Sequence, residues 1–487
     1  MNLNTRSTSI DKGNTVRDDF HEGAVLGMAI GDALGAPCQG LKPGRLKQAF
    51  GSVGGFLDPA RAFAIHPGNY RLKGLYSVPT QQSLAVIDSL LTMDRFDRED
   101  LKEVLLSLWG EDLSLFRGHD ESLRKAVRRL REGEDPRSSG QAHPGISGIP
   151  RSLGPALFFK DDEEAMLSSV IETTLLTHND PRAVCGALAF SLAAHSIAMN
   201  PEAILKNPGD FLEELKNRVE SGETFLRERY GRYMPPDAPE HAYTVMNNCL
   251  DVLAPCLRES NPDLVKRTLL AEANRHDPSF RITVVTQDFA PVAIPWAIYL
   301  AISSRSFGQG VLETVNEGKE ACVSGALTGA LLGLRFGSEG IPGEWIPLLI
   351  NSRQIALRGE ELAGGFPDWS ERVDLATLER KWTLRENAEK ASRREEYLHE
   401  KEKYERKHPR KPKAAELPPQ EEAPFSPPPE LVFGSDLPDP IKAKKEKAIR
   451  GKKRIDWKEH RRKKKKRGSD GSERGHPPFD DENKSGV

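Results

Sequence analysis

Residues 23–37 read Gly-Ala-Val-Leu-Gly-Met-Ala-Ile-Gly-Asp-Ala-Leu-Gly-Ala-Pro. Glycine recurs at every fourth position, 23, 27, 31 and 35, so in a helix the glycines form one face almost without side chains. Each glycine inside a helix costs about 0.5–1 kcal/mol relative to alanine, so the pattern predicts a very close neighbour on that face. The neighbour is either another helix or a ligand, and Pro37 ends the helix.

Helical spacing of apolar residues dominates the chain from about residue 18 to residue 378. It occurs in the segments 80–93, 162–174, 211–230, 242–257, 290–303, 321–334 and 346–362. Residues 181–199 are apolar on nearly all sides, which predicts a buried helix. The sequence has no alternating strand pattern and no repeat of fixed period. We therefore expect an all-α fold in a single large helical domain over residues 18–378.

Four further segments flank this domain. Residues 1–17 are polar and predict a disordered leader. Residues 379–408 carry opposite charges four positions apart and few apolar residues, which predicts a charged, exposed helix leaving the domain. The proline-rich stretch 409–440 predicts an extended linker, and residues 441–487 form a basic tail that we expect to be disordered.

The small net charge of −2 hides an uneven distribution of charge along the chain. Residues 441–467 contain 16 Lys and Arg against 3 Asp and Glu, a net charge of +13. The last 20 residues carry −3, so residues 1–440 carry −12. A basic segment of this density neutralises phosphates and favours salt-dependent binding of RNA or DNA.

The aromatic residue of the tail, Trp457, can stack on a base. The residues that we expect to contact nucleic acid are Lys452, Lys453, Arg454, Trp457, Arg461, Arg462, Lys463, Lys464, Lys465, Lys466 and Arg467. The alternative is a solvated tail that folds back on the acidic part of the chain. In a nucleated cell the same run would serve as a nuclear import signal.

The five cysteines, at positions 38, 185, 249, 256 and 322, are odd in number, and no two have the spacing of a metal site. This pattern predicts free, mostly buried thiols in a reducing compartment. The N-terminal residues contain no apolar segment of a signal peptide. The apolar runs 290–303 and 321–334 are shorter than the ~18–20 residues that cross a membrane. We therefore expect a cytoplasmic protein without a membrane partner.

Four separated stretches resemble the ADP-ribosylglycohydrolase family, in the family's order. The first is Gly23–Pro37, and the second, Tyr76–Ala85 (Tyr-Ser-Val-Pro-Thr-Gln-Gln-Ser-Leu-Ala), stands where the family has Tyr-Thr-Asp-Asp-Thr-Gln before a helix. Leu176–Val184 (Leu-Thr-His-Asn-Asp-Pro-Arg-Ala-Val) resembles the family's Thr-His segment. Gly325–Gly333, followed by Ile341-Pro342, resembles its last motif. Gly148–Arg151 is a shorter match to the family's loop that approaches the ADP-ribose phosphates.

The resemblance implies an all-α fold and a hydrolase that removes ADP-ribose with the help of two Mg²⁺ ions. It implies a cleft that binds an ADP-ribose-like ligand. The residues that it places in this cleft are Gly31, Asp32, Gln39, Ser77, Thr80, Arg151, His178, Asn316 and Lys319. For His178, contact with a ribose and a structural role before a buried helix are both open.

The acidic ligands of the family's two Mg²⁺ ions are missing from the matching positions. Such ions require oxygen ligands, chiefly carboxylates. Val78 and Pro79 occupy the first pair of aspartate positions, and Asn316 and Gly318 occupy the second. Gln39 stands where the family has a glutamate. No catalytic residue and no metal ligand is therefore assigned, and Mg²⁺ is expected only if the chain is a working hydrolase.

The replacements have a structural interpretation as well. Ser77 can cap the following helix, Pro79 suits its first turn, and Asn316 is another candidate N-cap. Lys319 stands where the family has a threonine next to a ligand. We expect its ammonium to occupy the vacated metal position, with one fixed cation replacing two ions.

The sequence therefore favours a catalytically inactive, metal-free binding or scaffold module of this type, able to retain an ADP-ribose-like ligand. Its tail would bring it to RNA or DNA. Two alternatives stay open. One is an active hydrolase that removes ADP-ribose from proteins or small molecules, and the other is a purely structural interaction protein. The oligomeric state is not defined by the sequence.

Overall fold

The computed structural model of the protein describes residues 19–58, 70–111, 113–118, 120–259, 261–364 and 371–407. The chain divides into two units, Met1–His408 and Pro409–Val487, and all described residues belong to the first. The predicted leader (1–17), linker (409–440) and basic tail (441–487) lie outside the described residues.

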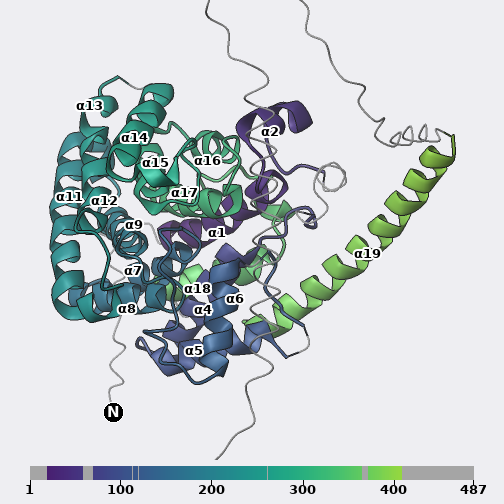
Figure 1. Ribbon diagram of the computed structural model, residues 1–487, viewed down its shortest axis with the longest axis horizontal. Coiled ribbons are helices and arrows are strands. Elements are labelled where there is room, and N and C mark those ends of the chain that lie inside the picture. The colour runs from purple at the N-terminus through teal and green to yellow at the C-terminus, as the bar shows by residue number, and fades with distance from the viewer. Residues whose placement is uncertain are drawn as a thin grey trace, which may run out of the picture. The chain divides into compact units, whose positions relative to one another are not determined.

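The described residues form helices and loops, and no β-strand occurs among them, which confirms the all-α prediction (Figure 1). The first helices are α1 (Asp19–Gly35), α2 (Pro43–Phe50), α4 (Val78–Met93), α5 (Arg98–Trp109) and α6 (Glu121–Arg131). The central ones are α7 (Leu153–Phe158), α8 (Glu163–Leu175), α9 (Pro181–Met199), α10 (Ala203–Lys206), α11 (Pro208–Phe225), α12 (His241–Asp251), α13 (Leu253–Leu257) and α14 (Pro262–His276). The last are α15 (Ala290–Ser303), α16 (Phe307–Val315), α17 (Ala321–Phe336), α18 (Ser352–Leu362) and α19 (Leu375–Lys407).

The glycine face of α1 packs against a second glycine face, on α17. A Cβ added at Gly31 would lie 1.9 Å from the carbonyl oxygen of Gly325, and one at Gly325 would lie 2.4 Å from that of Gly31. Gly27 faces Gly329 in the same way, and Gly23 faces Gly333. Of the two neighbours that the glycine pattern allows, a helix is therefore the correct one. The helices come so close that backbone meets backbone.

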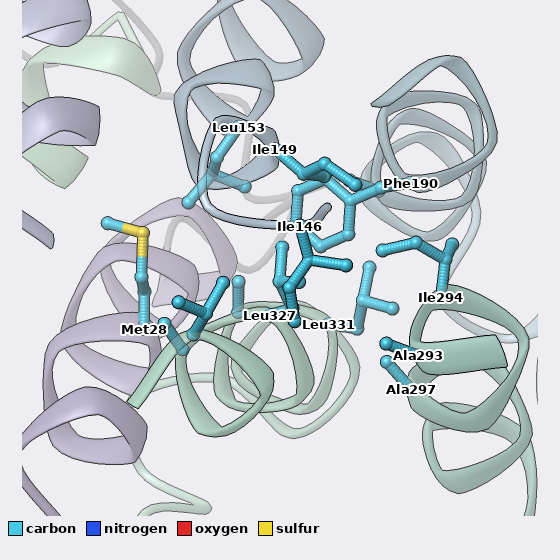
Figure 2. Close-up of a cluster of buried hydrophobic side chains, with 14 of the residues drawn as sticks. Met28, Ile146, Ile149, Leu153, Phe190, Ala293, Ile294, Ala297, Leu327 and Leu331 are labelled. Atoms are coloured by element: carbon cyan, nitrogen blue, oxygen red, sulfur yellow. The ribbon is translucent and has the colours of Figure 1, made fainter. Parts of the chain in front are cut away.

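The apolar helix predicted over residues 181–199 is α9, and it runs through the core. It packs against helices of both halves of the domain: α7, α8, α11, α12, α15 and α17. Within the described residues it alone has the length and composition to cross a membrane, but 78% of its most apolar window is buried by the protein. Figure 2 shows Phe190 of α9 next to Ile294 of α15 and to Ile146 and Ile149 of the loop ahead of α7.

Helix α19 begins at Leu375, so the predicted domain boundary at residues 378 and 379 falls inside it. The prediction of an exposed helix is wrong for its first half. Glu379 is completely buried, and Thr383 and Glu386 are 4% and 1% exposed. The charged residues of this half face buried partners. The prediction failed because it took a high density of charged residues as a sign of solvent exposure. The second half is exposed, and Figure 1 shows it projecting beyond the other helices.

Candidate functional site

A cavity of about 250 Å³, called the cleft below, lies where three of the four resembling stretches or the loops beside them meet. The start of α4 lines it with Ser77, Val78 and Pro79, and the start of α17 lines it with Glu320, Cys322 and Val323. Loops and the end of α1 complete the lining with Ala36, Gln39, Arg71, Gly118, Asp120, Ser147 and Asp288. A larger hollow of about 510 Å³ between α4, α5 and the start of α19 lies apart from these residues.

The start of α4 is closed by Asp32, which lies behind the wall of the cleft. Its carboxylate accepts hydrogen bonds from the backbone N–H groups of Ser77 (2.8 Å) and Thr80 (3.3 Å) and from both hydroxyls (2.5 and 2.7 Å). Asp32 therefore caps α4 from a different helix. Ser77 occupies the predicted N-cap position, but its hydroxyl donates to Asp32 instead of accepting from α4. Burial raises the pKa of Asp32, and the four hydrogen bonds oppose the shift.

Three carboxyl groups line the cleft, those of Glu320, Asp288 and Asp120. Glu320 accepts a hydrogen bond from Nε2 of Gln39 at 2.6 Å. Burial, and then the charge of Asp288, raise the pKa of Glu320 to about 7. Burial also raises the pKa of Asp288, although its side chain is 38% exposed and solvent limits the effect. Asp120 caps α6 through the N–H of Leu123 (2.8 Å) and also faces this space.

Arg71 brings a positive charge to the cleft beside Ser77. Its side chain is 9% exposed. Nη1 donates to the carbonyl of Tyr70 at 2.8 Å and lies 3.3 Å from Oε1 of Glu386 in α19. The described lining of the cleft thus carries one cation together with three carboxyl groups.

Only some of the nine residues that the resemblance places in the cleft line it in the structure. Gln39 and Ser77 line it. Asp32 and Thr80 lie behind the wall and bond each other. The prediction for Gly31 is wrong, because Gly31 packs on the backbone of Gly325 and not on a ligand space.

Arg151 and His178 are buried beneath the loop that carries Ser147. Arg151 donates to Gln82 (2.6 Å) and to the hydroxyl of Thr177, and it is completely buried. His178 bonds Thr177 (2.7 Å) and lies 3.4 Å from the Ser147 hydroxyl. Burial lowers the pKa of His178 to about 3, so the imidazole is neutral. Neither residue lines the cleft. Both lie under the loop of Ser147, which does line it, and so they support this loop.

The predictions for Asn316 and Lys319 are wrong. Asn316 ends α16 instead of capping α17, and its side chain bonds both the N–H (2.8 Å) and the carbonyl (3.0 Å) of Val53. Lys319 does not line the cleft, and no hydrogen bond of its ammonium occurs within the described part of the chain. Its backbone holds the loop after α1, through Leu41 and Gly40 at 2.7 Å each. The loop before α17 is thus built on backbone contacts.

The side chains around the cleft do not fit a pair of Mg²⁺ ions. Val78 and Pro79 offer no oxygen, and Asn316 is turned away toward Val53. Gly318 packs under the carbonyl of Leu41, where a Cβ would lie 2.3 Å from the oxygen. Within the described ranges, no group of three His, Cys, Asp or Glu side chains is placed to hold a metal ion.

The sequence reasoning missed Arg71, Asp120, Asp288 and Glu320 as residues of the cleft. Asp120 precedes a helix and reads as an ordinary cap, which it also is. Asp288 stands two residues before α15, where an acid is common at a helix start. Arg71 follows a loop that carries no helical pattern. The buried cysteines were predicted correctly: all five are free and buried.

The fold is that of a solved structure entitled "ADP-ribosylglycohydrolase-related protein complex". The similarity covers 72% of this chain and 98% of that chain, with a TM-score of 0.50 and 22% identity. Curated relatives include an ADP-ribosylarginine hydrolase, Tri1, of Pseudomonas putida, with 23% identity over 72% of this chain and 80% of the relative. An ADP-ribosyl-[dinitrogen reductase] glycohydrolase of Rhodospirillum rubrum is 23% identical, and the similarity covers 67% of this chain and 89% of the relative. An uncharacterized protein of Archaeoglobus fulgidus is 24% identical, over 66% and 88%.

The protein is thus an all-α protein with a cleft lined by the starts of α4 and α17. The sequence model of the ADP-ribosylglycohydrolase family matches residues 14–374. The chain belongs to the ADP-ribosylglycohydrolase family.

Proposed function

We propose that the chain is a metal-independent binding module of its family, which holds an ADP-ribose-like nucleotide without the family's metal-dependent hydrolysis. The start of α4 carries the proposal. There Val78 and Pro79 present apolar atoms to the cleft, and Asp32 satisfies the N–H groups of the helix end. A wall that would hold cations has become a wall that a ligand can contact directly.

The polar groups left in the cleft suit a ligand that carries hydroxyl groups. Carboxyl groups such as those of Glu320 and Asp288 accept hydrogen bonds from hydroxyls. Gln39 is fixed from both sides, because its Nε2 donates to Glu320 and its Oε1 accepts from the N–H of Cys322 at 3.0 Å. A ribose is a ligand of this type.

Calorimetric titration of the full chain with ADP-ribose, with Mg²⁺ and then with EDTA, tests the proposal. We expect micromolar binding that EDTA does not change. Binding that requires Mg²⁺, or release of ADP-ribose by the unmodified chain with Mg²⁺, would contradict it. The variant V78D/P79D is the matched comparison, because these two positions face the cleft whereas Asn316 does not. We expect this variant to gain Mg²⁺ binding.

A second candidate function rests on Glu320 and Asp288. A carboxyl group with a pKa of about 7 can donate a proton near neutral pH while a second carboxylate accepts one. Such a pair would hydrolyse the bond between ribose and a leaving nitrogen without metal. Water would attack the sugar carbon and give its proton to Asp288, while Glu320 protonates the nitrogen.

Incubation with ADP-ribosylarginine in EDTA tests this second function, since the Pseudomonas putida relative is named for that substrate. Release of ADP-ribose by the wild type that E320Q and D288N both lose would support it. No release by the wild type in EDTA would exclude it.

The basic segment 441–467 supports one more proposal, that the tail binds RNA or DNA. Its net charge of +13 is opposite to that of residues 1–440. Salt-dependent retention of RNA by the full chain, and its loss when residues 441–487 are deleted, tests this proposal.

A further inference from the structure

We propose that Arg71 binds the anionic group of the ligand, a phosphate or diphosphate, and that α19 positions it for this role. The proposal deepens the proposed function, because it rests on a nucleotide-like ligand in the same cleft. Arg71 enters the cleft between Ser77 and Gly118. A Cβ added at Gly118 would lie 2.4 Å from Nη2 of Arg71, so the guanidinium lies directly on this glycine.

The guanidinium of Arg71 keeps unused donors although its side chain is 91% buried. Nη1 bonds Tyr70 and Glu386, as described above. Nε is buried and has no hydrogen-bond partner. Nη2 makes no hydrogen bond to any described residue. An arginine offers its donors as a rigid fork that matches phosphate oxygens, so the unused edge is a ready site for an anion.

The buried network behind Arg71 contains one more positive than negative charge. Arg117 lies 2.6 Å from Glu379, and Glu386 lies 3.3 Å from Arg71 and 2.7 Å from Lys390. Three cations therefore share two carboxylates. Glu379 and Glu386 are at most 1% exposed, and Arg117 is 2% exposed, so solvent screens these charges weakly, whereas Lys390 is 27% exposed and is screened in part. An anion bound at Arg71 would neutralise the surplus positive charge.

Other positive groups near the cleft are already used or point elsewhere. The N–H groups at the start of α4, which would attract an anion, are taken by Asp32 and by the carbonyl of Arg117. Arg151 is bonded to Gln82 and Thr177 beneath the loop of Ser147. Among the described residues, Arg71 is the one cation that lines the cleft.

Two neighbouring carboxyl groups of the cleft set the direction of the ligand. Glu320 and Asp288 lie close enough for the charge of Asp288 to raise the pKa of Glu320, and both would repel phosphate oxygens and accept hydrogen bonds from hydroxyls. The anionic end of a ligand is therefore placed at Arg71, and its sugar hydroxyls are placed at Glu320 and Asp288.

Helix α19 takes part because Glu386 fixes the guanidinium from behind. The helix lies beyond the end of the family match at residue 374. Its first half packs on α4 and α5, and Thr383 bonds both Arg117 (3.0 Å) and the carbonyl of Leu115 (3.1 Å). The cation of the cleft is thus oriented by a segment that the family match does not include.

The test uses the full chain, with calorimetric titration of two probes, ADP-ribose and inorganic pyrophosphate. We expect R71M to weaken both probes at least 10-fold and R71K to weaken them less. The matched control is R95M, which removes an arginine that is 66% exposed and pairs with Asp97. R95M should stay within twofold of wild type. R71M leaves Glu386 buried with Lys390 as its partner, which could destabilise the fold. The double variant R71M/E386Q is therefore titrated as well, and a melting curve of each variant shows whether it is folded.

The outcomes separate this inference from the proposed function. If folded R71M and R71M/E386Q bind both probes like wild type, Arg71 is not the anion site, while the proposed function survives. If wild type binds pyrophosphate through Arg71 but does not bind ADP-ribose, the anion site stands and the proposed ligand is wrong. If wild type binds neither probe, both are overturned.

Discussion

The buried carboxylate of Asp32 accepts hydrogen bonds from two backbone N–H groups and two hydroxyls at the start of α4. D32A would leave these donors buried without an acceptor, and we expect a loss of about 3–5 kcal/mol in the free energy of unfolding. D32N should cost about 1 kcal/mol, because its oxygen can take the place of Oδ2 and its amide can donate to the Ser77 hydroxyl. Urea unfolding at pH 7 measures both. Equal losses of stability in D32A and D32N would mean that the negative charge of Asp32 contributes more to stability than the arrangement of its acceptor oxygens.

Glu320 should make the stability depend on pH. Its pKa is raised to about 7, so the folded chain binds this proton more tightly than the unfolded chain, in which the glutamate has its ordinary pKa of 4.5. The stabilisation is fully present below about pH 4.5 and is lost as the pH rises through 7. We expect the stability of wild type relative to E320Q to fall by about 1–3 kcal/mol between pH 4.5 and pH 8.

Urea unfolding at several pH values measures this difference. The control is E344Q, which changes an exposed glutamate outside the cleft. Its profile should run parallel to that of wild type. A pH-independent difference between wild type and E320Q would contradict the raised pKa.

At the scale of the elements, the contact between α1 and α17 leaves no room for a methyl group. In G31A the new Cβ would have to lie 1.9 Å from a backbone oxygen, so the two helices must separate. We expect a loss of at least about 3 kcal/mol, or an insoluble protein. G44A, in the exposed helix α2, meets nothing within 4 Å and should gain about 0.4–1 kcal/mol. Thermal melting compares the two. A stable G31A would mean that the helices are farther apart than described.

The first half of α19 should be required for folding, although it lies beyond the predicted boundary. A chain that ends at residue 378 lacks Glu379, which bonds Tyr76 (2.6 Å), Gln81 (2.6 Å) and Arg117. Arg117 would remain buried without its counter-charge, at a cost of about 3–5 kcal/mol. A chain that ends at residue 407 should melt like the full chain. Equal melting temperatures of the two truncated chains would show that α19 is dispensable.

The fold could be predicted from the sequence because its signals are local and repeated. Four-residue glycine spacing on α1 predicts a very close neighbour, and the apolar residues of α9 require burial on all sides. That the neighbour is α17, and not a ligand, comes from the structure. The charged face of α19 could not be predicted in the same way. Glu379 and Glu386 read as solvent-exposed residues until their partners, Arg117 and Arg71, are brought to them by the fold.

The lining of the cleft could be predicted only in part. Gln39 and Ser77 follow from the resemblance because Gln39 comes directly after the first motif and Ser77 directly before α4, whose start the second motif determines. Arg71, Asp120 and Asp288 lie on loops, and their direction depends on long-range packing. The prediction for Asn316 failed for a related reason. A polar residue between two helices can end the first or begin the second, and the hydrogen bonds of Asn316 to Val53 decide which.

At the scale of the whole molecule, the acidic and basic parts of the chain predict a salt-dependent interaction. If the tail binds nucleic acid, the full chain should retain RNA at low salt, and the logarithm of the affinity should fall linearly with that of the salt concentration. Deletion of residues 441–487 should abolish the retention, while W457A should weaken it by about 1–3 kcal/mol if the indole stacks on a base. A filter-binding assay measures both. Equal retention by the deletion variant would place the interaction elsewhere.

The glycine contact between α1 and α17 has a consequence for synthesis of the protein. Gly31 and Gly325 come from opposite ends of the domain, so α1 emerges from the ribosome long before its partner. At ~5–20 residues per second, translation of the intervening chain takes about 15–60 s. Throughout that interval the glycine face of α1 lacks the helix that covers it in the folded domain. The nascent domain therefore cannot close around α1 until α17 has been synthesised.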